Sequence, residues 1–302
     1  MAGSQDFAYD PRNEAALVYL NGALLPREAA LVSVFDAGFA LGDGVWEGIR
    51  LNRGRLMFLD AHLDRLFAGA AAISLDIGLD RTGITDALYR LVHANGMTDG
   101  VHIRLMVTRG PKRTVNQDPR FSLGQPTVAI TAEYKTPPEA AWRAGLSLAT
   151  SRIRCTGADM FDMRLNSHSR LSLILALQDA IAAGADEALM LDKAGNVSTC
   201  NATNFFCVKD GAVLTSTGEY CFNGVTRGNV IALCRAAGVP IMCGDFSLAA
   251  AHAADEAFVT GTMGGITPVR AIDGRMMPAV PGQMTRRLRA LYEDLMDLEA
   301  GV

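Results

Sequence analysis

The sequence predicts an α+β (mixed α/β) fold, and three observations lead to this prediction. Short β-branched and apolar stretches are interleaved with segments whose apolar residues recur at helical spacing. The interleaving is irregular, and no G-x-G-x-x-G segment follows a strand and opens a helix, which argues against a regular Rossmann arrangement. The chain has 302 residues, of which 49% are hydrophobic, so it can bury a sizeable core in one large domain or two.

The first part of the chain is expected to contain strands and two helices. Asn21-Gly22 follows an apolar run and is a hairpin signal. Asp60 could cap the first helix, and the second stops near Gly96. The expected elements are a strand at Ala16–Leu20, helices at Asp60–Ile73 and Asp80–Ala94, and strands at Val101–Val107 and Thr127–Thr131.

A proline-containing break then divides the chain. Tyr134-Lys135-Thr136-Pro137-Pro138 interrupts regular structure, because proline has no amide hydrogen and restricts the residue before it. We therefore expect a smaller N-terminal α/β domain over residues 1–133, a linker over 134–141 and a larger C-terminal α/β domain over 142–302. The C-terminal elements expected are a strand at Leu146–Ser151, a helix at about Ser169–Ala183, a strand pair at Ala188–Leu191 and Phe205–Val208, a helix from Thr226, a strand at Ala257–Thr260 and a helix at about Gln283–Leu298.

Composition excludes several classes of protein. A net charge of −4 gives no electrostatic reason to expect nucleic acid or an anionic membrane as a partner. The first residues lack a basic start followed by an apolar stretch, so no secretory signal is expected. The six cysteines contain no C-x-x-C pair and predict reduced, buried thiols, with no metal site. We expect a cytoplasmic protein.

Four separated segments carry the residue types of a ligand site. Arg65 lies among apolar helix residues, where a partly buried guanidinium favours a bidentate anion. Thr226 could cap a helix start whose free amides favour phosphate. The segments are Leu41–Gly48 (LGDGVWEG), His62–Leu66 (HLDRL), Phe222–Asn229 (FNGVTRGN) and Glu256–Ile266 (EAFVTGTMGGI).

Taken together, these segments resemble the class IV aminotransferases, the fold-type-IV pyridoxal-phosphate enzymes that include branched-chain and D-amino-acid aminotransferases and aminodeoxychorismate lyase. The resemblance runs from about Ala16 to Tyr292 and also includes Phe35–Phe39, Val107–Gly110 and Ile266–Val269. It implies the two-domain fold of that class, a homodimer and a pyridoxal or pyridoxamine 5'-phosphate cofactor. It also implies that Arg65, Val225, Thr226 and Thr262 hold the cofactor phosphate, and that Trp46, His102 and Arg104 face the substrate.

The chain departs from the family pattern where the family carries a lysine before the long helix. Matching the Asp-Met pair of Phe161-Asp162-Met163 puts Arg164 in that slot, whereas counting back from the helix without a gap puts Asn166 there. The family lysine joins the cofactor covalently and moves a proton. Arginine stays protonated and asparagine cannot form the bond, so neither replaces it. His168 could move a proton in a lysine-free site.

Two further observations bear on the reaction. The chain has only four lysines, Lys112, Lys135, Lys193 and Lys209, and none lies in this slot. Thr199 stands where the family usually has a glutamate that pairs the pyridine nitrogen, so the ring is expected to be a weaker electron sink.

These observations leave three functions open. The first is an aminotransferase-like protein that holds the cofactor noncovalently and acts on a small amine, amino acid or keto acid with impaired catalysis. The second is a noncatalytic cofactor- or metabolite-binding protein on this scaffold. The third is a lyase or racemase, suggested by Thr199. The sequence leaves the substrate and its handedness open.

Overall fold

The structure, a computed structural model, describes residues 3–4, 6–137 and 139–302. The chain divides into two compact units. Unit 1 comprises Met1–Ala8, Pro137–Arg164 and Leu171–Val302, and unit 2 comprises Tyr9–Thr136 and Leu165–Arg170. The expected domain limits stay a prediction, because compactness does not test whether a segment folds alone.

Within the described residues, unit 2 contains a six-stranded sheet in the order β2-β1-β6-β5-β3-β4. All of its neighbouring strands are antiparallel. The strands are β1 (Val18–Leu20), β2 (Ala23–Leu25), β3 (Gly44–Asn52), β4 (Arg55–Leu56), β5 (Val101–Thr108) and β6 (Thr127–Tyr134). The helices are α1 (Ala37–Leu41), α2 (Leu59–Ala72) and α3 (Arg81–Ala94), with short 3₁₀ turns at Pro11–Ala15, Arg27–Ala29 and Pro119–Phe121.

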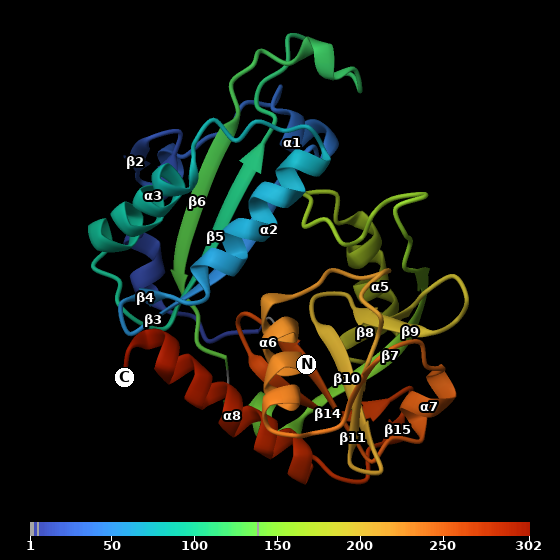
Figure 1. The fold of residues 1–302 in the computed structure, drawn as a ribbon. Coiled ribbons are helices and arrows are strands. Elements are labelled where there is room, and N and C mark those ends of the chain that lie inside the picture. The colour runs from blue at the N-terminus through green and yellow to red at the C-terminus, as the bar shows by residue number, and fades with distance from the viewer. Residues whose placement is uncertain (1–2, 5, 138) are drawn as a thin grey trace. The chain divides into compact units, whose positions relative to one another are not determined.

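The two faces of this sheet differ. Helices α2 and α3 cover one face (Figure 1), and the core between them and the strands includes Ile49, Leu66 and Leu88, all nearly inaccessible to solvent. Strand β5 alternates buried and half-buried residues. Because successive strand residues point to opposite faces, His102 and Arg104 share the face turned away from this core.

Unit 1 is built on a larger mixed sheet. Over the described residues it has nine strands, in the order β12-β11-β10-β13-β14-β7-β8-β9, with β15 paired to β14. Strand β7 runs parallel to both β14 and β8, and β11 runs parallel to β12. The strands are β7 (Leu146–Arg154), β8 (Glu187–Leu191), β9 (Val197–Cys200), β10 (Asn204–Lys209), β11 (Ala212–Thr215), β12 (Ile241–Cys243), β13 (Glu256–Gly261), β14 (Gly265–Ile272) and β15 (Arg275–Met276).

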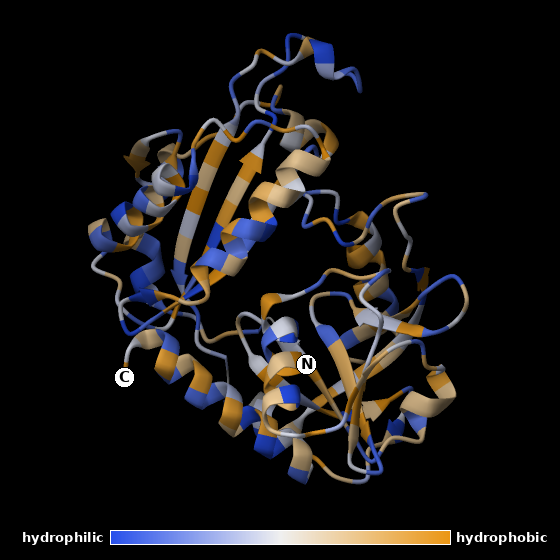
Figure 2. Cartoon of the chain, in the orientation of Figure 1, coloured by the Kyte–Doolittle hydropathy of each residue, from blue (hydrophilic) through white to orange (hydrophobic). Residues whose placement is uncertain are grey.

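The longest helix of unit 1, α8 (Gln283–Ala300), buries one stripe of side chains. Along α8, polar and apolar residues alternate (Figure 2), and Leu288, Tyr292 and Met296 are buried at intervals of four residues. This spacing places them on one face of the helix. The helices are α4 (Glu139–Ala144), α5 (Leu171–Ala182), α6 (Val225–Ala236), α7 (Leu248–His252) and α8 (Gln283–Ala300).

Most expected elements are present, and the mixed α/β prediction is confirmed. Asn21 and Gly22 form the hairpin turn with φ of 48° and 92°, and Asp80 caps α3 by accepting from the Gly83 amide. The expected cap at Asp60 is wrong, because α2 begins one residue earlier, after Phe58, and Asp60 lies inside its first turn.

Two other local predictions are wrong. Thr226 does not cap α6, because the helix begins at Val225 after Gly224 and has no side-chain cap. Strands β8 and β10, expected as a pair, do not pair with each other; β8 pairs with β7 and β9, and β10 pairs with β11 and β13. Non-local pairing of this kind leaves no signal in a local sequence pattern.

Two global features follow from the described residues. None of the helices among them combines the length and the apolar character that crossing a bilayer requires. All six cysteines are free; Cys243 is exposed, in contrast to the expectation of buried thiols, and the other five are buried.

Candidate functional site

The candidate site in unit 2 includes Trp46 and Glu47, which lie on opposite faces of β3. Glu47 is fully buried and lies under α2, where its carboxylate accepts from Arg65 Nε at 2.8 Å and from Arg65 Nη2 at 2.6 Å, and pairs with His62 Nδ1 at 2.7 Å. Burial acts to raise the pKa of Glu47, but the hydrogen bonds from Arg65 and His62 outweigh it and hold the pKa below its ordinary value. Glu47 therefore fixes the guanidinium of Arg65 in place.

The segment 165–170 lies along the first residues of β3. Ser167 forms an antiparallel bridge with Val45, and the Trp46 amide donates to the Asn166 carbonyl at 2.9 Å. The Asn166 side chain donates in turn to the Trp46 carbonyl at 2.5 Å, and the Trp46 indole nitrogen donates to the Ser167 carbonyl at 3.2 Å. These bonds fix both the strand and the indole ring against the segment.

The two residues that could stand in the lysine slot have different surroundings. Asn166 is 5% exposed, and its Oδ1 has no hydrogen-bond partner. Arg164 belongs to unit 1, where it is exposed and pairs with Asp162 at 2.8 Å. Of the two, only Asn166 bonds to a residue expected to face the substrate.

Arginine side chains lie over the Trp46 ring. The guanidinium carbon of Arg104, on β5, is 3.8 Å from the ring centroid, and that of Arg170 is 5.1 Å away. Such cation–π contacts fix the orientation of the cations. Burial lowers the pKa of Arg104. Burial, followed by repulsion from Arg104 and Arg65, lowers the pKa of Arg170 to about 10.

Two histidines in unit 2 share this positive environment. Burial and then Arg104 and Arg170 lower the pKa of His168 to about 4, and its buried Nε2 has no hydrogen-bond partner. Burial, then Lys135 and Arg104, lowers the pKa of His102 to about 4 as well. Both side chains are therefore neutral at neutral pH.

In unit 1, the start of α6 is held in place by Asn204 on β10. The Gly224 amide donates to Asn204 Oδ1 at 3.1 Å, and Asn204 Nδ2 donates to the Phe222 carbonyl at 2.7 Å. Helix α6 has no side-chain cap, so its first amides are free of such a contact. Opposite Asn204 on β13 lies Thr260, whose buried hydroxyl has no hydrogen-bond partner. This frame has the features of a phosphate site at a helix N-terminus.

Thr199 and Thr262 are the remaining expected cofactor residues. The Thr199 hydroxyl donates to the Thr203 carbonyl at 2.8 Å and accepts from Asn204 Nδ2 at 3.3 Å. Its hydrogen is thus already engaged and cannot also be directed to a ligand. Thr262 lies, half-buried, in the turn between β13 and β14.

The four lysine amines have partners elsewhere. Lys135 pairs with Glu133 at 2.8 Å, Lys193 with Asp159 at 3.2 Å and Lys209 with Asp255 at 2.9 Å. Lys112 donates to the Asp118 carbonyl at 2.8 Å. None of these hydrogen bonds or ion pairs involves Trp46, Asn166 or the first turn of α6.

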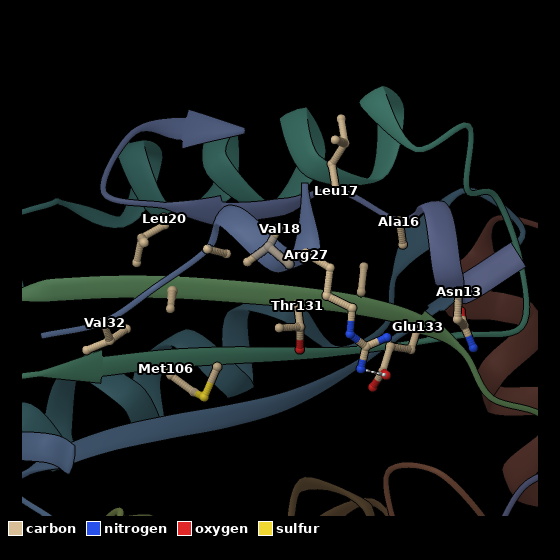
Figure 3. Close-up of a pocket in the computed structure, with 13 residues that line it drawn as sticks. Asn13, Ala16, Leu17, Val18, Leu20, Arg27, Val32, Met106, Thr131 and Glu133 are labelled. Atoms are coloured by element: carbon tan, nitrogen blue, oxygen red, sulfur yellow. Dashed lines mark ion pairs between the residues drawn. The ribbon is translucent and has the colours of Figure 1, made fainter. Parts of the chain in front are cut away.

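Unit 2 also contains a cavity of about 290 Å³, drawn in Figure 3. Strands β1 and β6 and the chain around Arg27 line it, and Arg27 pairs with Glu133 inside it at 3.6 Å. None of the expected site residues is among its described lining residues. We assign it no ligand.

Comparison with known proteins identifies the family. Residues 44–272 match the family model described as amino-transferase class IV. The chain belongs to the class IV aminotransferases. Its relatives in the family include proteins named as branched-chain-amino-acid aminotransferases or as like them, and others named as D-alanine aminotransferases.

Similarity to other members of the class IV aminotransferases extends over almost the whole chain. Identity is 39% to the branched-chain-amino-acid aminotransferase-like protein 1 of Arabidopsis thaliana, over 97% of this chain and 52% of the relative. The chain thus spans about half the length of that relative. Identity is 35% to a putative branched-chain-amino-acid aminotransferase of Methanocaldococcus jannaschii, over 92% of this chain and 96% of the relative.

A solved structure of a class IV member has the same fold. The T.th. branched-chain amino acid aminotransferase complexed with N-(5'-phosphopyridoxyl)-L-glutamate superimposes with a TM-score of 0.87 and 28% identity, over 94% of this chain and 95% of that one. The expected fold-type-IV architecture is therefore confirmed.

The structure brings together part of the expected set. In unit 2 it groups Trp46, Arg104, Asn166 and His168, whereas Arg65 is bound to Glu47. In unit 1 it joins Thr199 to the start of α6 through Asn204. Sequence analysis missed Arg170 and Asn204. A signal for Asn204 existed, since a buried asparagine at a strand start needs partners for its amide.

Proposed function

We propose that this class IV chain binds pyridoxal or pyridoxamine 5'-phosphate without a covalent bond and acts on a small amine or amino acid with impaired transamination. The observation that carries the proposal is the position of Asn166, a buried amide bonded to Trp46 where the family resemblance calls for an amine. An amide nitrogen is not nucleophilic and cannot replace a lysine. We propose that Asn166, rather than Arg164, occupies the lysine position.

The residues present fit one part of such a cofactor and not another. The uncapped start of α6, with the buried Thr226 and the unpartnered Thr260 hydroxyl beside it, fits a phosphate group. Residue 166 offers no amine for covalent attachment, and the lysines take part in bonds to other residues: Lys135 to Glu133, Lys193 to Asp159, Lys209 to Asp255 and Lys112 to the Asp118 carbonyl. A carboxylate for the pyridine nitrogen is also missing at Thr199, whose hydroxyl hydrogen is engaged.

Each residue then has a proposed task. The amides of Val225 and Thr226 and the hydroxyl of Thr262 hold the phosphate, with Arg65 as the cation that the family resemblance assigns to it. When bound, the cofactor supplies the group that exchanges with the substrate amine. Trp46, His102 and Arg104 orient the substrate.

His168 is the group we propose to move a proton, at Nε2. With a pKa of about 4 it is neutral at pH 7, but an imidazole of such low basicity is a weak proton acceptor. Burial is the largest cause of this low pKa, and the positive charges of Arg104 and Arg170 add to it. This limit is a second physical reason to expect slow turnover.

Measurements of cofactor retention and of substrate turnover test the proposal together. The purified chain is incubated with each form of the cofactor, passed through a desalting column and then offered a panel of amino donors and keto acids. We expect saturable binding, loss of the cofactor on denaturation and turnover far below that of a lysine-containing family member. Fast transamination would contradict impaired catalysis, and absence of binding would contradict the cofactor proposal.

Two alternatives remain distinguishable. A noncatalytic binding protein on this scaffold is favoured by the missing amine and would bind the cofactor without product from any donor. A lyase or racemase is favoured by the engaged Thr199 hydroxyl. It would release pyruvate, or lose optical activity, without any keto-acid acceptor.

We also propose a cytoplasmic homodimer that binds neither nucleic acid nor membrane. Exposed apolar side chains of unit 2 support self-association, including Leu31 at 76%, Val34 at 65% and Phe39 at 74% exposure. Light scattering of the purified chain would give twice the chain mass if this is right. A monomer at micromolar concentration would contradict it.

A further inference from the structure

Arg227 is a buried arginine in the first turn of α6. It is 6% exposed and is the third residue of the helix. Among the residues that the structure describes, no acidic side chain forms an ion pair with Arg227, and its hydrogen bonds go to neutral groups. A cation near the positive end of a helix dipole is unfavourable, and burial adds to the cost. The stability of the helix alone therefore does not explain an arginine at this position.

Two neutral acceptors hold the guanidinium of Arg227 in a fixed plane. Its Nη1 donates to Asn223 Oδ1 at 3.0 Å, and its Nη2 donates to the Ser216 carbonyl at 2.6 Å. Ser216 directly follows β11, and Asn223 lies two residues before α6. The side chain of Arg227 thus ties both ends of the segment 216–223 to the first turn of α6.

The segment 216–223 is also closed by a bond of its own. Asn223 Nδ2 donates to the Gly218 carbonyl at 3.0 Å. Gly218 has a φ of 87°, and a Cβ at this position would collide with Asn223 Oδ1 and lie 3.3 Å from Arg227 Nη1. A residue with a side chain fits neither this backbone conformation nor this close approach. The segment is therefore shaped around the contact between Arg227 and Asn223.

Asn204 holds the start of α6 from β10. It bonds to the Gly224 amide and to the Phe222 carbonyl, so Asn204 and Arg227 together fix the backbone on which the first helical residues follow. A phosphate site at a helix start depends on the direction of its backbone amides. The buried Nε of Arg227 has no hydrogen-bond partner, and buried polar atoms are rarely left unpaired unless a ligand, ion or water completes the site.

We propose that Arg227 is a positioning residue for the cofactor phosphate. By binding Asn223 and Ser216 it fixes the residues before α6, so that the amides of Val225 and Thr226 face the phosphate. An anion at the helix start also offsets the cost of the buried cation. The inference rests on the proposed phosphate site at α6 and adds to it a residue that acts through the backbone amides.

Affinities for pyridoxamine 5'-phosphate and for pyridoxamine test the inference, because the two probes differ only in the phosphate. Each Kd is measured by calorimetry on the full chain, and their ratio gives the preference for the phosphorylated probe. We expect a clear preference in the natural chain, reduced about tenfold or more in Arg227→Met, because both bonds to the segment 216–223 are lost. The affinity for pyridoxamine should change little, whereas a merely structural role would lower both affinities and leave their ratio unchanged.

Two further variants separate the geometry of Arg227 from its charge. Arg227→Lys keeps the charge but lacks the planar fork, so its preference should stay well below that of the natural chain. Asn223→Ala, at an exposed position, leaves Arg227 in place without the acceptor for Nη1 and should lower the preference about threefold. The matched control is Arg235→Met, an exposed arginine in the last turn of the same helix, which should leave the preference unchanged.

Thermal unfolding establishes whether each variant is folded. An unchanged preference in Arg227→Met, or in Asn223→Ala if Arg227→Met does not fold, would overturn the inference. The natural preference in Arg227→Lys would also overturn it, because charge alone would then suffice. Equal binding of the two probes by the natural chain would instead contradict the proposed phosphate site itself, and it is seen before any variant is compared.

Discussion

The start of α6 in unit 1 and the Trp46 cluster in unit 2 hold their arginines in different ways. At the helix start, Arg227 donates to the Asn223 side chain and to the Ser216 carbonyl, and the amide of Asn204 bonds to Gly224 and Phe222. In the Trp46 cluster, Arg104 and Arg170 lie over the indole ring, and His168 Nε2 has no hydrogen-bond partner. Hydrogen bonds to neutral groups position the arginine of the first region, whereas contacts with an aromatic face position those of the second. We therefore expect the two regions to respond differently to mutation and to pH.

The largest expected effect is the gain of a covalent bond in Asn166→Lys. Asn166 is buried against the Trp46 carbonyl, and a lysine there supplies the missing amine in a site where burial lowers its pKa. Incubation with pyridoxal 5'-phosphate should give a pH-dependent absorbance band at about 410–430 nm. The control is Arg164→Lys, whose position is exposed and paired with Asp162. A band in the control but not in Asn166→Lys would reverse the assignment of the lysine slot.

The second effect is loss of stability in Glu47→Gln. This change leaves Arg65 and the buried His62 without their carboxylate. Removing one partner of a buried ion pair typically costs about 3–5 kcal/mol in the free energy of unfolding. Urea unfolding would measure it, with Glu139→Gln as the control, because Glu139 and Arg143 form an exposed surface pair whose loss should change stability little. Equal losses of unfolding free energy in the two variants would mean that the pairing of Glu47 with Arg65 and His62 does not stabilise the fold.

The third effect concerns the hydrogen bonds that hold the start of α6. Asn204→Ala removes the acceptor for the Gly224 amide and the donor to the Phe222 carbonyl. We expect a loss of about 1–3 kcal/mol in unfolding free energy and weaker retention of the cofactor. If Asn204→Ala retained the cofactor as well as the natural chain does, the proposed role of the α6 start would be wrong.

The fourth effect is a dependence of stability on pH. The folded-state pKa values of His102 and His168, about 4, lie below the ordinary value of 6.5. The unfolded chain therefore binds more protons between these values, and the unfolding free energy falls as pH drops from 6.5 towards 4. Each histidine should account for about 2 kcal/mol between pH 7.5 and 5. Urea unfolding at both pH values should show a smaller change in unfolding free energy in His102→Gln and His168→Gln than in the natural chain. An equal change would exclude these two histidines as the cause of the pH dependence.

Features of the fold and the site could be predicted from the sequence where they depend on residues close together in the chain. Helix α3 was predictable because Asp80 caps it locally and Gly96 follows it. The alternation of His102 and Arg104 on one face of β5 was also predictable, because strand side chains repeat every second residue. Both properties are set within a few residues of chain.

The rest depended on contacts between distant segments. Arg170 contacts the Trp46 ring because the segment 165–170 lies along β3, more than 100 residues earlier in the chain, as the bridge between Val45 and Ser167 shows. Thr199 was expected at the position of the family glutamate, but sequence did not show that its hydroxyl donates to the Thr203 carbonyl in the turn that follows it. The caps expected at Asp60 and Thr226 were wrong because the N-cap of each helix lies two residues earlier in the chain, at Phe58 and at Gly224.

The most direct test of the lysine-free proposal is the intact mass of the natural chain after incubation with pyridoxal 5'-phosphate and reduction with borohydride, followed by mapping of any modified residue. We predict that no stoichiometric, site-specific adduct forms on the natural chain, whereas Asn166→Lys gains one reduced cofactor at residue 166. A stoichiometric adduct on a single lysine of the natural chain, at Lys112, Lys135, Lys193 or Lys209, would contradict the proposal.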